Sequence, residues 1–277
     1  MAADEKETRG EIIVVRFILN VRSARIRFTS AQTVALLRIA CVAAVLCTCA
    51  GQSYSQGGPP LITDDPGTPE NGKWENNFAF TLDNTASGQE YETPIADINY
   101  GLGGHIQLKI ELPWLVEKAP NTAAETGLGN TLVGVKVRFL DEESSFVSVS
   151  TYPQYLFNYS RTAAVGGTQF FLPVEIAKSM GRLEFDCEAG YNFIQNTPGL
   201  WTLGGIAGYF PVESTELLVE VHAGSVLGSG GGNETFLNLG GRYKFTDSVI
   251  LLVSAGRSLS PPGANEYLGY LGMQFLM

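Results

Sequence analysis

The stretch "LEFDCEAGYNF", from Leu183 to Phe193, alternates apolar and polar side chains almost without exception. Leu, Phe, Cys, Ala, Tyr and Phe occupy the odd positions, and Glu, Asp, Glu, Gly and Asn occupy the even ones. Successive side chains of a β-strand point to opposite faces of the sheet, so a period of two predicts a strand with one apolar and one polar face.

The same alternation recurs along the chain and predicts an all-β protein of about twelve strands. Six segments show it clearly: 73–83, 106–114, 169–176, 183–193, 217–222 and 235–245. Weaker alternation fills the gaps, in segments 90–100, 131–139, 146–157, 200–210, 248–257 and 266–276. Pro94, Pro113, Pro153 and Pro173 fall inside these segments, where we expect bulges or strand ends because proline donates no ladder hydrogen bond.

Alternation alone does not separate a soluble sandwich from a membrane barrel, because both have two-faced strands. Most of the segments are about 9–11 residues long, which a tilted strand needs to cross a bilayer, whereas soluble strands are usually nearer five or six. The connections alternate in length, as in outer-membrane barrels, where outer loops are long and periplasmic turns are short. The longer ones are 84–89, 115–127, 158–168, 194–199, 225–233 and 258–265, and the shorter ones are 101–105, 140–145, 179–182, 211–216 and 246–247.

Aromatic residues lie near the predicted strand ends on the apolar face. They are Trp74, Tyr100, Trp114, Tyr155, Tyr191, Phe193, Phe210, Tyr243, Phe245 and Phe275. Aromatic side chains gather at both interfaces of a membrane, so this distribution favours a transmembrane antiparallel up-and-down β-barrel over a sandwich core. An even number of strands predicts that both termini are periplasmic.

Residues 1–50 have the pattern of a signal peptide with an extended N-region. Arginines precede the apolar stretch 39–46, among them Arg16, Arg22, Arg25, Arg27 and Arg38, and Thr48-Cys49-Ala50 offers the small residues of a cleavage site, so we expect cleavage near Ala50. The basic region is long, and a start near Val21 would shorten it. A lipoprotein signal is the alternative, although Thr48 precedes Cys49 where Gly or Ala is expected. The remaining chain divides into an N-terminal periplasmic arm, 51–72, and an outer-membrane barrel, 73–277.

Composition narrows the functional classes. The chain has 18 Lys and Arg against 28 Asp and Glu, and the predicted leader is basic, so the exported part is more acidic still. An acidic chain argues against nucleic-acid binding, which needs a basic surface. Three of the four cysteines lie in the leader, which leaves Cys187 alone and predicts no internal disulfide.

Several motifs resemble the family called MetA-pathway of phenol degradation. They are Ile62-Thr63-Asp64-Asp65-Pro66-Gly67-Thr68-Pro69, Trp74-Glu75, Asp97-Ile98-Asn99-Tyr100-Gly101-Leu102, Gln107-Leu108-Lys109 and Ser254-Ala255-Gly256-Arg257-Ser258. The resemblance covers about 60–277 and implies an outer-membrane transporter barrel, with no implication for the substrate. One departure is the end of the chain, Phe275-Leu276-Met277, because outer-membrane barrels usually end on an aromatic residue that the barrel-assembly machinery reads. Met277 has the outward parity of Phe275, so we expect assembly to succeed.

If the apolar face meets outer-membrane lipid, the opposite residues line the lumen. These candidates are Glu75, Lys109, Glu111, Lys136, Arg138, Phe171, Glu175, Glu184, Asp186, Glu188, Glu220, His222, Phe236, Arg242 and Lys244. We expect Arg242 and Lys244 to lie beside Glu220, and Glu175 to share a wall with the three acids of the opening stretch. Two interpretations stand side by side: a hydrated filling of mutually neutralising charges, or a selective pathway, narrow because twelve strands lie between filled barrels and wide porins.

The predicted function is passive passage of small solutes through an outer-membrane channel or transporter. The apolar residues Phe171 and Phe236 at inward parity raise the option of aromatic or other apolar solutes; their alternative role is to fill space. A structural or adhesive barrel with a plugged lumen is the second class. A lipid-modifying enzyme is the third, but neither His105 in a short turn nor His222 at inward parity faces lipid beside a serine, so no catalytic residue is predicted.

The segment Asp64-Asp65-Pro66-Gly67 lies in the arm just before the barrel and is the candidate mouth turn. Pro fixes φ and Gly accepts a positive φ, which favours a turn. Calcium binding is the alternative, but two adjacent carboxylates without further oxygen ligands make a poor site. No metal, cofactor or nucleic-acid partner is predicted. The arm is expected to fold at the barrel mouth or to reach into the lumen.

Overall fold

The computed structural model describes residues 58–85, 88–158, 167–226, 234–260 and 266–277. The predicted signal peptide and the first residues of the predicted arm therefore lie outside the described residues. Regular secondary structure in the described part consists of β-strands. None of the described residues forms a helix of the length and hydropathy needed to span a membrane.

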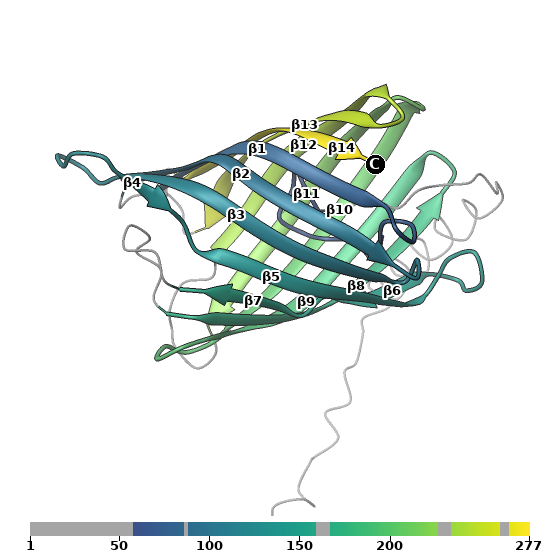
Figure 1. Cartoon of the computed structure of the whole chain (residues 1–277), viewed down its shortest axis with the longest axis horizontal. Coiled ribbons are helices and arrows are strands. Elements are labelled where there is room, and N and C mark those ends of the chain that lie inside the picture. The colour runs from purple at the N-terminus through teal and green to yellow at the C-terminus, as the bar shows by residue number, and fades with distance from the viewer. Residues whose placement is uncertain (1–57, 86–87, 159–166, 227–233, 261–265) are drawn as a thin grey trace, which may run out of the picture. The chain divides into compact units, whose positions relative to one another are not determined.

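The strands form one closed antiparallel barrel (Figure 1). Their bounds are β1 Trp74–Thr85, β2 Gly88–Leu102, β3 Ile106–Lys118, β4 Glu125–Leu128, β5 Thr131–Leu140, β6 Ser148–Thr151, β7 Gln154–Phe157, β8 Gln169–Met180, β9 Leu183–Ile194, β10 Leu200–Val212, β11 Thr215–Val226, β12 Glu234–Thr246, β13 Val249–Ser260 and β14 Tyr267–Leu276. β4 and β5 are two parts of one barrel strand, because both pair with β3, and β6 and β7 are two parts of another, because both pair with β5 and β8. The fourteen segments thus make twelve barrel strands, which confirms the predicted fold class.

The barrel closes between its first and last strands. β1 and β14 pair over their whole length, from Glu75 opposite Leu276 to Asn84 opposite Tyr267. The amide of Trp74 and the carbonyl of Met277 are 2.7 Å apart, and the reverse bond is 2.9 Å long. Closure leaves no unpaired strand edge, as a sheet surrounded by lipid requires.

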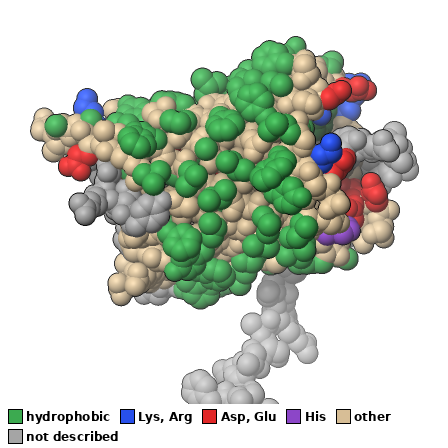
Figure 2. Space-filling model, viewed as in Figure 1, with side chains coloured by type: hydrophobic (Ala, Val, Ile, Leu, Met, Phe, Trp, Pro, Cys, Tyr) green, Lys and Arg blue, Asp and Glu red, His purple; other side chains and the backbone are tan. Residues whose placement is uncertain are grey.

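Burial in the barrel is the reverse of burial in a soluble protein. Large apolar side chains are exposed on the outer surface, such as Phe78 at 46%, Val174 at 46% and Leu217 at 52%, whereas Glu175 and Glu220 are fully buried inside. Figure 2 shows the apolar side chains spread over the barrel wall, with charged side chains at its two ends. An apolar outside and a polar inside are what a bilayer selects in a strand barrel.

Most of the predicted aromatic set lies on the outer surface. Trp74, Trp114, Phe193, Tyr243 and Phe245 are exposed, and their rings form pairs such as Trp74 with Tyr100, whose centroids are 4.7 Å apart. On β10 the exposed aromatic side chains are Trp201 and Tyr209, whereas Phe210, which the sequence placed in this set, is half-buried. Along most of β10 the even-numbered residues are the less exposed ones, so the assignment of Phe210 to the outer surface is wrong.

The connections follow the predicted alternation with three exceptions. One end of the barrel carries the short turns 103–105, 181–182, 213–214 and 247–248, together with 141–147, which was predicted to be short but is longer than 119–124 and 195–199 at the other end. The opposite end carries the longer connections 119–124, 158–168, 195–199, 227–233 and 261–266. The predicted long loop at 84–89 is wrong, because β1 continues to Thr85 and β2 begins at Gly88. The predicted loop 115–127 is shorter than expected, because β3 continues to Lys118 and β4 begins at Glu125.

The four in-strand prolines behave in two ways. Pro94 coincides with a register shift between Glu92 and Ile95, and Pro153 lies in the gap between β6 and β7, as predicted. Pro113 and Pro173 instead sit inside continuous strands, β3 and β8. The amide of Gly129 donates to the carbonyl of Pro113, and the hydroxyl of Thr151 donates to the carbonyl of Pro173. Both donors lie where the neighbouring barrel strand is interrupted, so the irregularity falls on the partner strand and not on the proline's own strand.

Candidate functional site: the lumen and the N-terminal arm

Residues 58–73 lead into β1 from inside the barrel. The side chains of Leu61, Thr63 and Asp65 are nearly inaccessible, at 9%, 0% and 4% exposure. Leu61 packs with Ile206 of β10 and Leu218 of β11 in an apolar cluster on the inner wall. The arm therefore lies in the lumen, and this segment, which we call the arm from here on, is the centre of the candidate site.

Glu220 of β11 binds the backbone of the arm. Its carboxylate accepts hydrogen bonds from the amide of Ile62 at 3.1 Å and from the amide of Thr63 at 2.5 Å. Asn238 of β12, which lies opposite Glu220 in the register, donates to the other carboxylate oxygen. A fully buried carboxylate needs such donors, so Glu220 and the arm satisfy each other.

Carbonyl groups of the arm are bound by the next two strands. Arg242 of β12 donates to the carbonyl of Pro59 at 3.0 Å, and Ser254 of β13 donates to the carbonyl of Pro60 at 2.6 Å. Prolines have no amide donor, so their carbonyls are the polar backbone groups of this stretch that must find partners. Three adjacent strands thus hold the arm through its backbone.

The charged partners on this wall differ from the predicted ones. We expected Arg242 and Lys244 beside Glu220, but the register places Glu216 opposite Arg242, and their charged groups form an ion pair of 3.0 Å. Glu220 lies four residues further along β11, at the level of Asn238. The prediction counted the inward residues of both strands correctly but assumed the wrong register.

The predicted mouth turn lies inside the lumen and is tied to β5. The carboxylate of Asp64 pairs with the ammonium group of Lys136 at 2.9 Å, and the same ammonium group lies 3.6 Å from Glu175 of β8 and binds the carbonyl of Asp65. The carboxylate of Asp65 accepts a hydrogen bond from the amide of Gly67, which closes the predicted turn. The described residues contain no group of three or more His, Cys, Asp or Glu arranged to hold a metal ion.

The two neighbouring carboxyl groups of the turn have opposite electrostatic environments. Burial raises the pKa of Asp64, but the ammonium groups of Lys136 and Lys109 outweigh burial and hold the pKa of this carboxyl below its ordinary value. Burial also raises the pKa of Asp65, and the lysine charge does not overcome it, so the pKa of Asp65 stays above its ordinary value. Asp64 is thus the charged anchor of the turn.

Glycines in the wall make room for the arm. A Cβ atom on Gly204 of β10 would lie 2.0 Å from the hydroxyl oxygen of Thr63 and 2.9 Å from its Cβ atom. A Cβ atom on Gly101 of β2 would lie 2.2 Å from the carbonyl oxygen of Glu70. Real Cβ atoms do not approach other atoms so closely, so these positions accept only glycine while the arm is in place.

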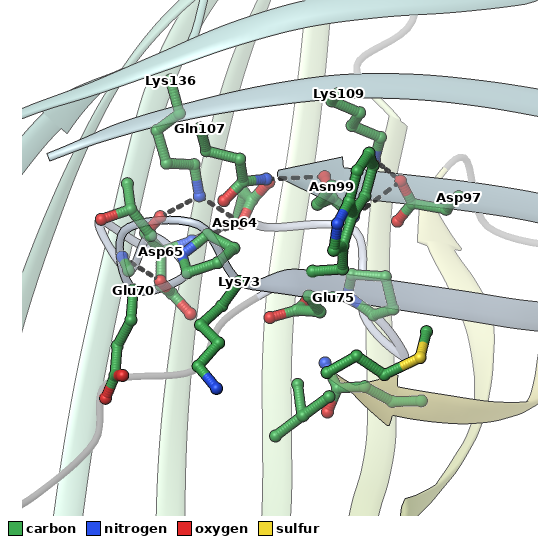
Figure 3. Close-up of a pocket in the computed structure, with 18 of the residues that line it drawn as sticks. Asp64, Asp65, Glu70, Lys73, Glu75, Asp97, Asn99, Gln107, Lys109 and Lys136 are labelled. Atoms are coloured by element: carbon green, nitrogen blue, oxygen red, sulfur yellow. Dashed lines mark hydrogen bonds and ion pairs between the residues drawn. The ribbon is translucent and has the colours of Figure 1, made fainter. Parts of the chain in front are cut away.

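The arm separates two cavities in the lumen. The cavity toward the short turns, which we call the turn-side chamber, has a volume of about 460 Å³, and the one toward the long connections, the loop-side chamber, about 400 Å³. Pro59, Asp64 and Lys109 line both. Figure 3 shows the turn-side chamber with Asp64, Asp65 and Lys136 on one side and Glu75, Asp97 and Lys109 on the other.

The predicted lumen-lining residues are distributed over these features. Those lining the turn-side chamber are Glu75, Lys109, Lys136, Arg138 and Arg242, with Asp64, Asp65 and Gly67 of the turn; Pro66 is buried beside them. Those lining the loop-side chamber are Lys109, Glu111, Phe171, Glu188 and His222. Glu175, Glu184, Asp186 and Glu220 are buried inside the barrel, and Phe236 and Lys244 are half-buried and line neither chamber.

The acidic residues of β8 and β9 form one wall, with Glu175 opposite Glu188 and Ala177 opposite Asp186 in the register. Glu175 accepts a hydrogen bond of 2.5 Å from the hydroxyl of Ser150 and lies near Lys136. This wall therefore belongs to the same charge network as the turn of the arm.

Sequence reasoning missed a polar network on the opposite wall. Asp97 accepts hydrogen bonds from Asn77 at 3.1 Å and Asn99 at 3.0 Å, and Gln107 donates to Asn99 at 2.7 Å and to the hydroxyl of the fully buried Tyr152 at 3.3 Å. Asp97, Asn99 and Gln107 share the inward parity of Lys109, so the alternation contained the signal. Tyr152 lies in the gap between β6 and β7, where parity gives no direction.

No family model matches the chain, and no curated protein matches it. Several solved structures with a similar fold are outer-membrane channels or porins. The barrel is similar to an outer membrane channel from Pseudomonas putida F1 (TM-score 0.58, 13% identity, 78% of this chain and 100% of that one), to the NanC porin (TM-score 0.55, 11% identity, 72% and 98%) and to the KdgM porin in complex with disordered oligogalacturonate (TM-score 0.53, 12% identity, 73% and 98%).

Proposed function

We propose that this protein is an outer-membrane channel for the passive passage of small solutes, and that the arm closes its lumen. The observation that carries the proposal is the position of the arm, which lies between the turn-side and loop-side chambers. Side chains of β5, β11, β12 and β13 bind it there. The backbone of a closed barrel needs no such segment, since neighbouring strands already satisfy each other's hydrogen bonds. The likeness of the fold to porins supports the same interpretation.

The loop-side chamber favours small solutes that have an apolar part. Apolar side chains from the arm and three strands line it, namely Ile62, Leu132, Leu156 and Phe171, and Tyr270 and His222 add hydrogen-bonding groups. A cavity of about 400 Å³ with this mixture suits a small aromatic or aliphatic molecule with one or two polar substituents. Phe171 is the predicted apolar residue that supports this class.

The cellular setting follows from the same proposal. We place the barrel in a bacterial outer membrane, with the leader removed near Ala50, both termini in the periplasm and the short turns on that side. We also propose that the chain belongs to the MetA-pathway of phenol degradation family, and the resemblance of its motifs supports this. We further propose that the barrel-assembly machinery inserts the barrel into this membrane.

Two other classes remain as alternatives to test. A structural or adhesive barrel would keep the arm in place permanently and conduct nothing. A lipid-modifying enzyme needs a nucleophile and a base on the lipid-facing surface, whereas His222 lines the loop-side chamber and His105 lies in the turn between β2 and β3. The positions of these two histidines support the channel over the enzyme.

Conductance in planar bilayers tests the proposal. Two purified chains are compared, one beginning at Gly58 and one beginning at Lys73, so that they differ only in the arm. We expect small or rare openings in the first and a large rise in conductance in the second. Liposome swelling with glycerol, amino acids and phenol then gives the solute profile. Folded barrels that conduct nothing with or without the arm would contradict the channel proposal.

A further inference from the structure

The tip of the arm, residues 58–63, is bound mainly through its backbone. The guanidinium group of Arg242 donates to the carbonyl of Gly58 at 3.4 Å and to the carbonyl of Pro59 at 3.0 Å. The hydroxyl of Ser254 donates to the carbonyl of Pro60 at 2.6 Å. Side chains of two neighbouring strands, β12 and β13, thus bind three successive carbonyl groups.

The second half of the tip is bound through its amides. Glu220 accepts hydrogen bonds from the amides of Ile62 and Thr63, at 3.1 and 2.5 Å, on the same carboxylate oxygen. Asn238 donates to the other oxygen and so holds the carboxylate in this orientation. Every peptide has backbone carbonyls and nearly every one has successive amides, so these contacts recognise a peptide chain and not one particular sequence.

One side chain of the tip has a pocket of its own. Leu61 is 9% exposed and packs against Ile206 and Leu218, which are 4% and 3% exposed. Gly240 of β12 leaves room for it, because a Cβ atom there would lie 3.1 Å from a methyl carbon of Leu61. The wall therefore combines backbone-binding groups with an apolar pocket for one aliphatic side chain.

We infer that this part of the wall is a binding site for short peptides with an aliphatic side chain, which the tip of the arm occupies as an intramolecular ligand. We call it the seat, and it is formed by Ile206, Leu218, Glu220, Asn238, Arg242 and Ser254. When the arm leaves, the carboxylate of Glu220 loses two amide donors, and a peptide in solution supplies the same groups in the same order. The inference rests on the proposed function, because the seat is free only while the arm is released, and it makes short peptides a class of solute that competes with the arm.

Calorimetric titration of the full exported chain, beginning at Gly51, in detergent micelles tests the seat without requiring conduction. The probe is a synthetic copy of residues 58–64, acetylated and amidated at its ends. Leu61→Asp in the protein frees the seat, because a carboxylate against two buried apolar side chains is unfavourable, whereas the peptide keeps its leucine. We expect this variant to bind the peptide and the wild type to bind it at least about tenfold more weakly, since the attached arm competes at a high effective concentration.

Two further comparisons test the atoms that bind the backbone. Glu220→Gln, added to Leu61→Asp, should weaken peptide binding by about tenfold or more, since hydrogen bonds to charged groups are the strong ones. The same peptide methylated on the two backbone nitrogens that correspond to Ile62 and Thr63 donates no hydrogen bond there, and its binding should be weakened as much.

Glu142→Gln, added to Leu61→Asp, is the matched control. Glu142 also accepts a hydrogen bond from a backbone amide, that of Ser179 at 3.0 Å, but it lies at the turn-side end of β8 and not in the seat. This control should leave peptide binding within about twofold of Leu61→Asp alone. Heat-dependent migration in gel electrophoresis checks that each variant is a folded barrel, and Leu61→Asn takes the place of Leu61→Asp if the aspartate variant does not fold.

Three results would each overturn the seat: no binding of the peptide by the folded Leu61 variant, binding that Glu220→Gln leaves unchanged, or equal binding of the methylated peptide. A protein that binds the peptide as expected but never conducts would overturn the channel instead, so the two failures are distinguishable.

Discussion

Replacement of Gly204 by alanine should displace the arm. The new Cβ atom would lie 2.0 Å from the hydroxyl oxygen of Thr63, and 2.9 Å from both the Cβ and the Cγ2 atoms of that residue. Rotation of the threonine side chain does not relieve the contact, because its Cβ atom does not move with the rotation. The backbone of Thr63 is also held by Glu220 at 2.5 Å, so the arm as a whole must shift.

The size of the effect follows from the cost of overpacking. Extra methyl groups in a well-packed site cost about 1–3 kcal/mol. Only the seated arm meets the new methyl group, so this cost applies to the seated state and not to the released one. Since about 1.4 kcal/mol is a factor of ten, the ratio of released to seated arm should rise by about 5-fold to 150-fold.

Single-channel recording in planar bilayers measures this ratio as open probability. The neighbouring Gly205 provides a matched control, because a Cβ atom there meets nothing nearer than the carbonyl oxygen of Asp186 at 3.9 Å. Gly205→Ala should behave as wild type. The double variant Gly204→Ala with Thr63→Gly removes the obstruction and should restore the closed state. The reasoning is refuted if folded Gly204→Ala barrels open no more often than wild type, or if Gly205→Ala opens them equally.

Four further predictions concern the arm and the loop-side chamber. The pKa of Asp64 is lowered in the seated arm. The stabilisation of the seated arm by Asp64 is therefore complete above the ordinary pKa of an aspartate and is lost as the pH falls through the lowered pKa. Asp64→Asn should raise open probability at pH 7, and the difference from wild type should vanish in acid. The pKa of Asp65 is raised, so its charge opposes seating, and Asp65→Asn should lower open probability at pH 7 in the same recordings. Glu220→Gln loses the charge that binds two amides of the arm and should raise open probability by about tenfold, which corresponds to about 1.5 kcal/mol. Gly190→Ala places a Cβ atom 2.4 Å from the ring of Phe171 and should push the ring into the chamber, so swelling assays should show slower entry of phenol with unchanged entry of glycerol.

Alternation in the sequence was sufficient to predict the barrel, because each strand meets lipid on one side and polar groups on the other. The number of strands and the inward parity of Glu75, Lys136, Glu175 and Glu220 follow from it directly. The register between strands does not, which is why Arg242 was paired with the wrong acid. A period of two determines which face of the sheet a residue occupies, but not its height along the barrel axis.

The position of the arm was only partly predictable. The turn at Asp64 to Gly67 has a local cause in Pro and Gly, so the sequence reveals it. The groups that hold it are far away in the sequence: Lys136 is 72 positions from Asp64, and Glu220 is 157 positions from Thr63. A further contact is with Gly204, whose lack of a side chain matters only next to the arm. Local sequence patterns do not predict such distant partners. From the sequence alone, Gly204 does not differ from any other glycine in a strand.

The hydrogen bonds between Trp74 and Met277 have a consequence for the order of folding. The first and last barrel strands pair with each other, so the ring cannot close before the final residues of the chain are available. Pairing over such a long sequence separation is slow, and it completes last. The arm precedes β1 and contacts β11, β12 and β13, so it can meet its binding groups while the ring is still open on one side. A chain supplied with the arm attached would then fold around it, whereas a synthetic arm peptide added to a finished arm-less barrel would have to enter through one of the two mouths.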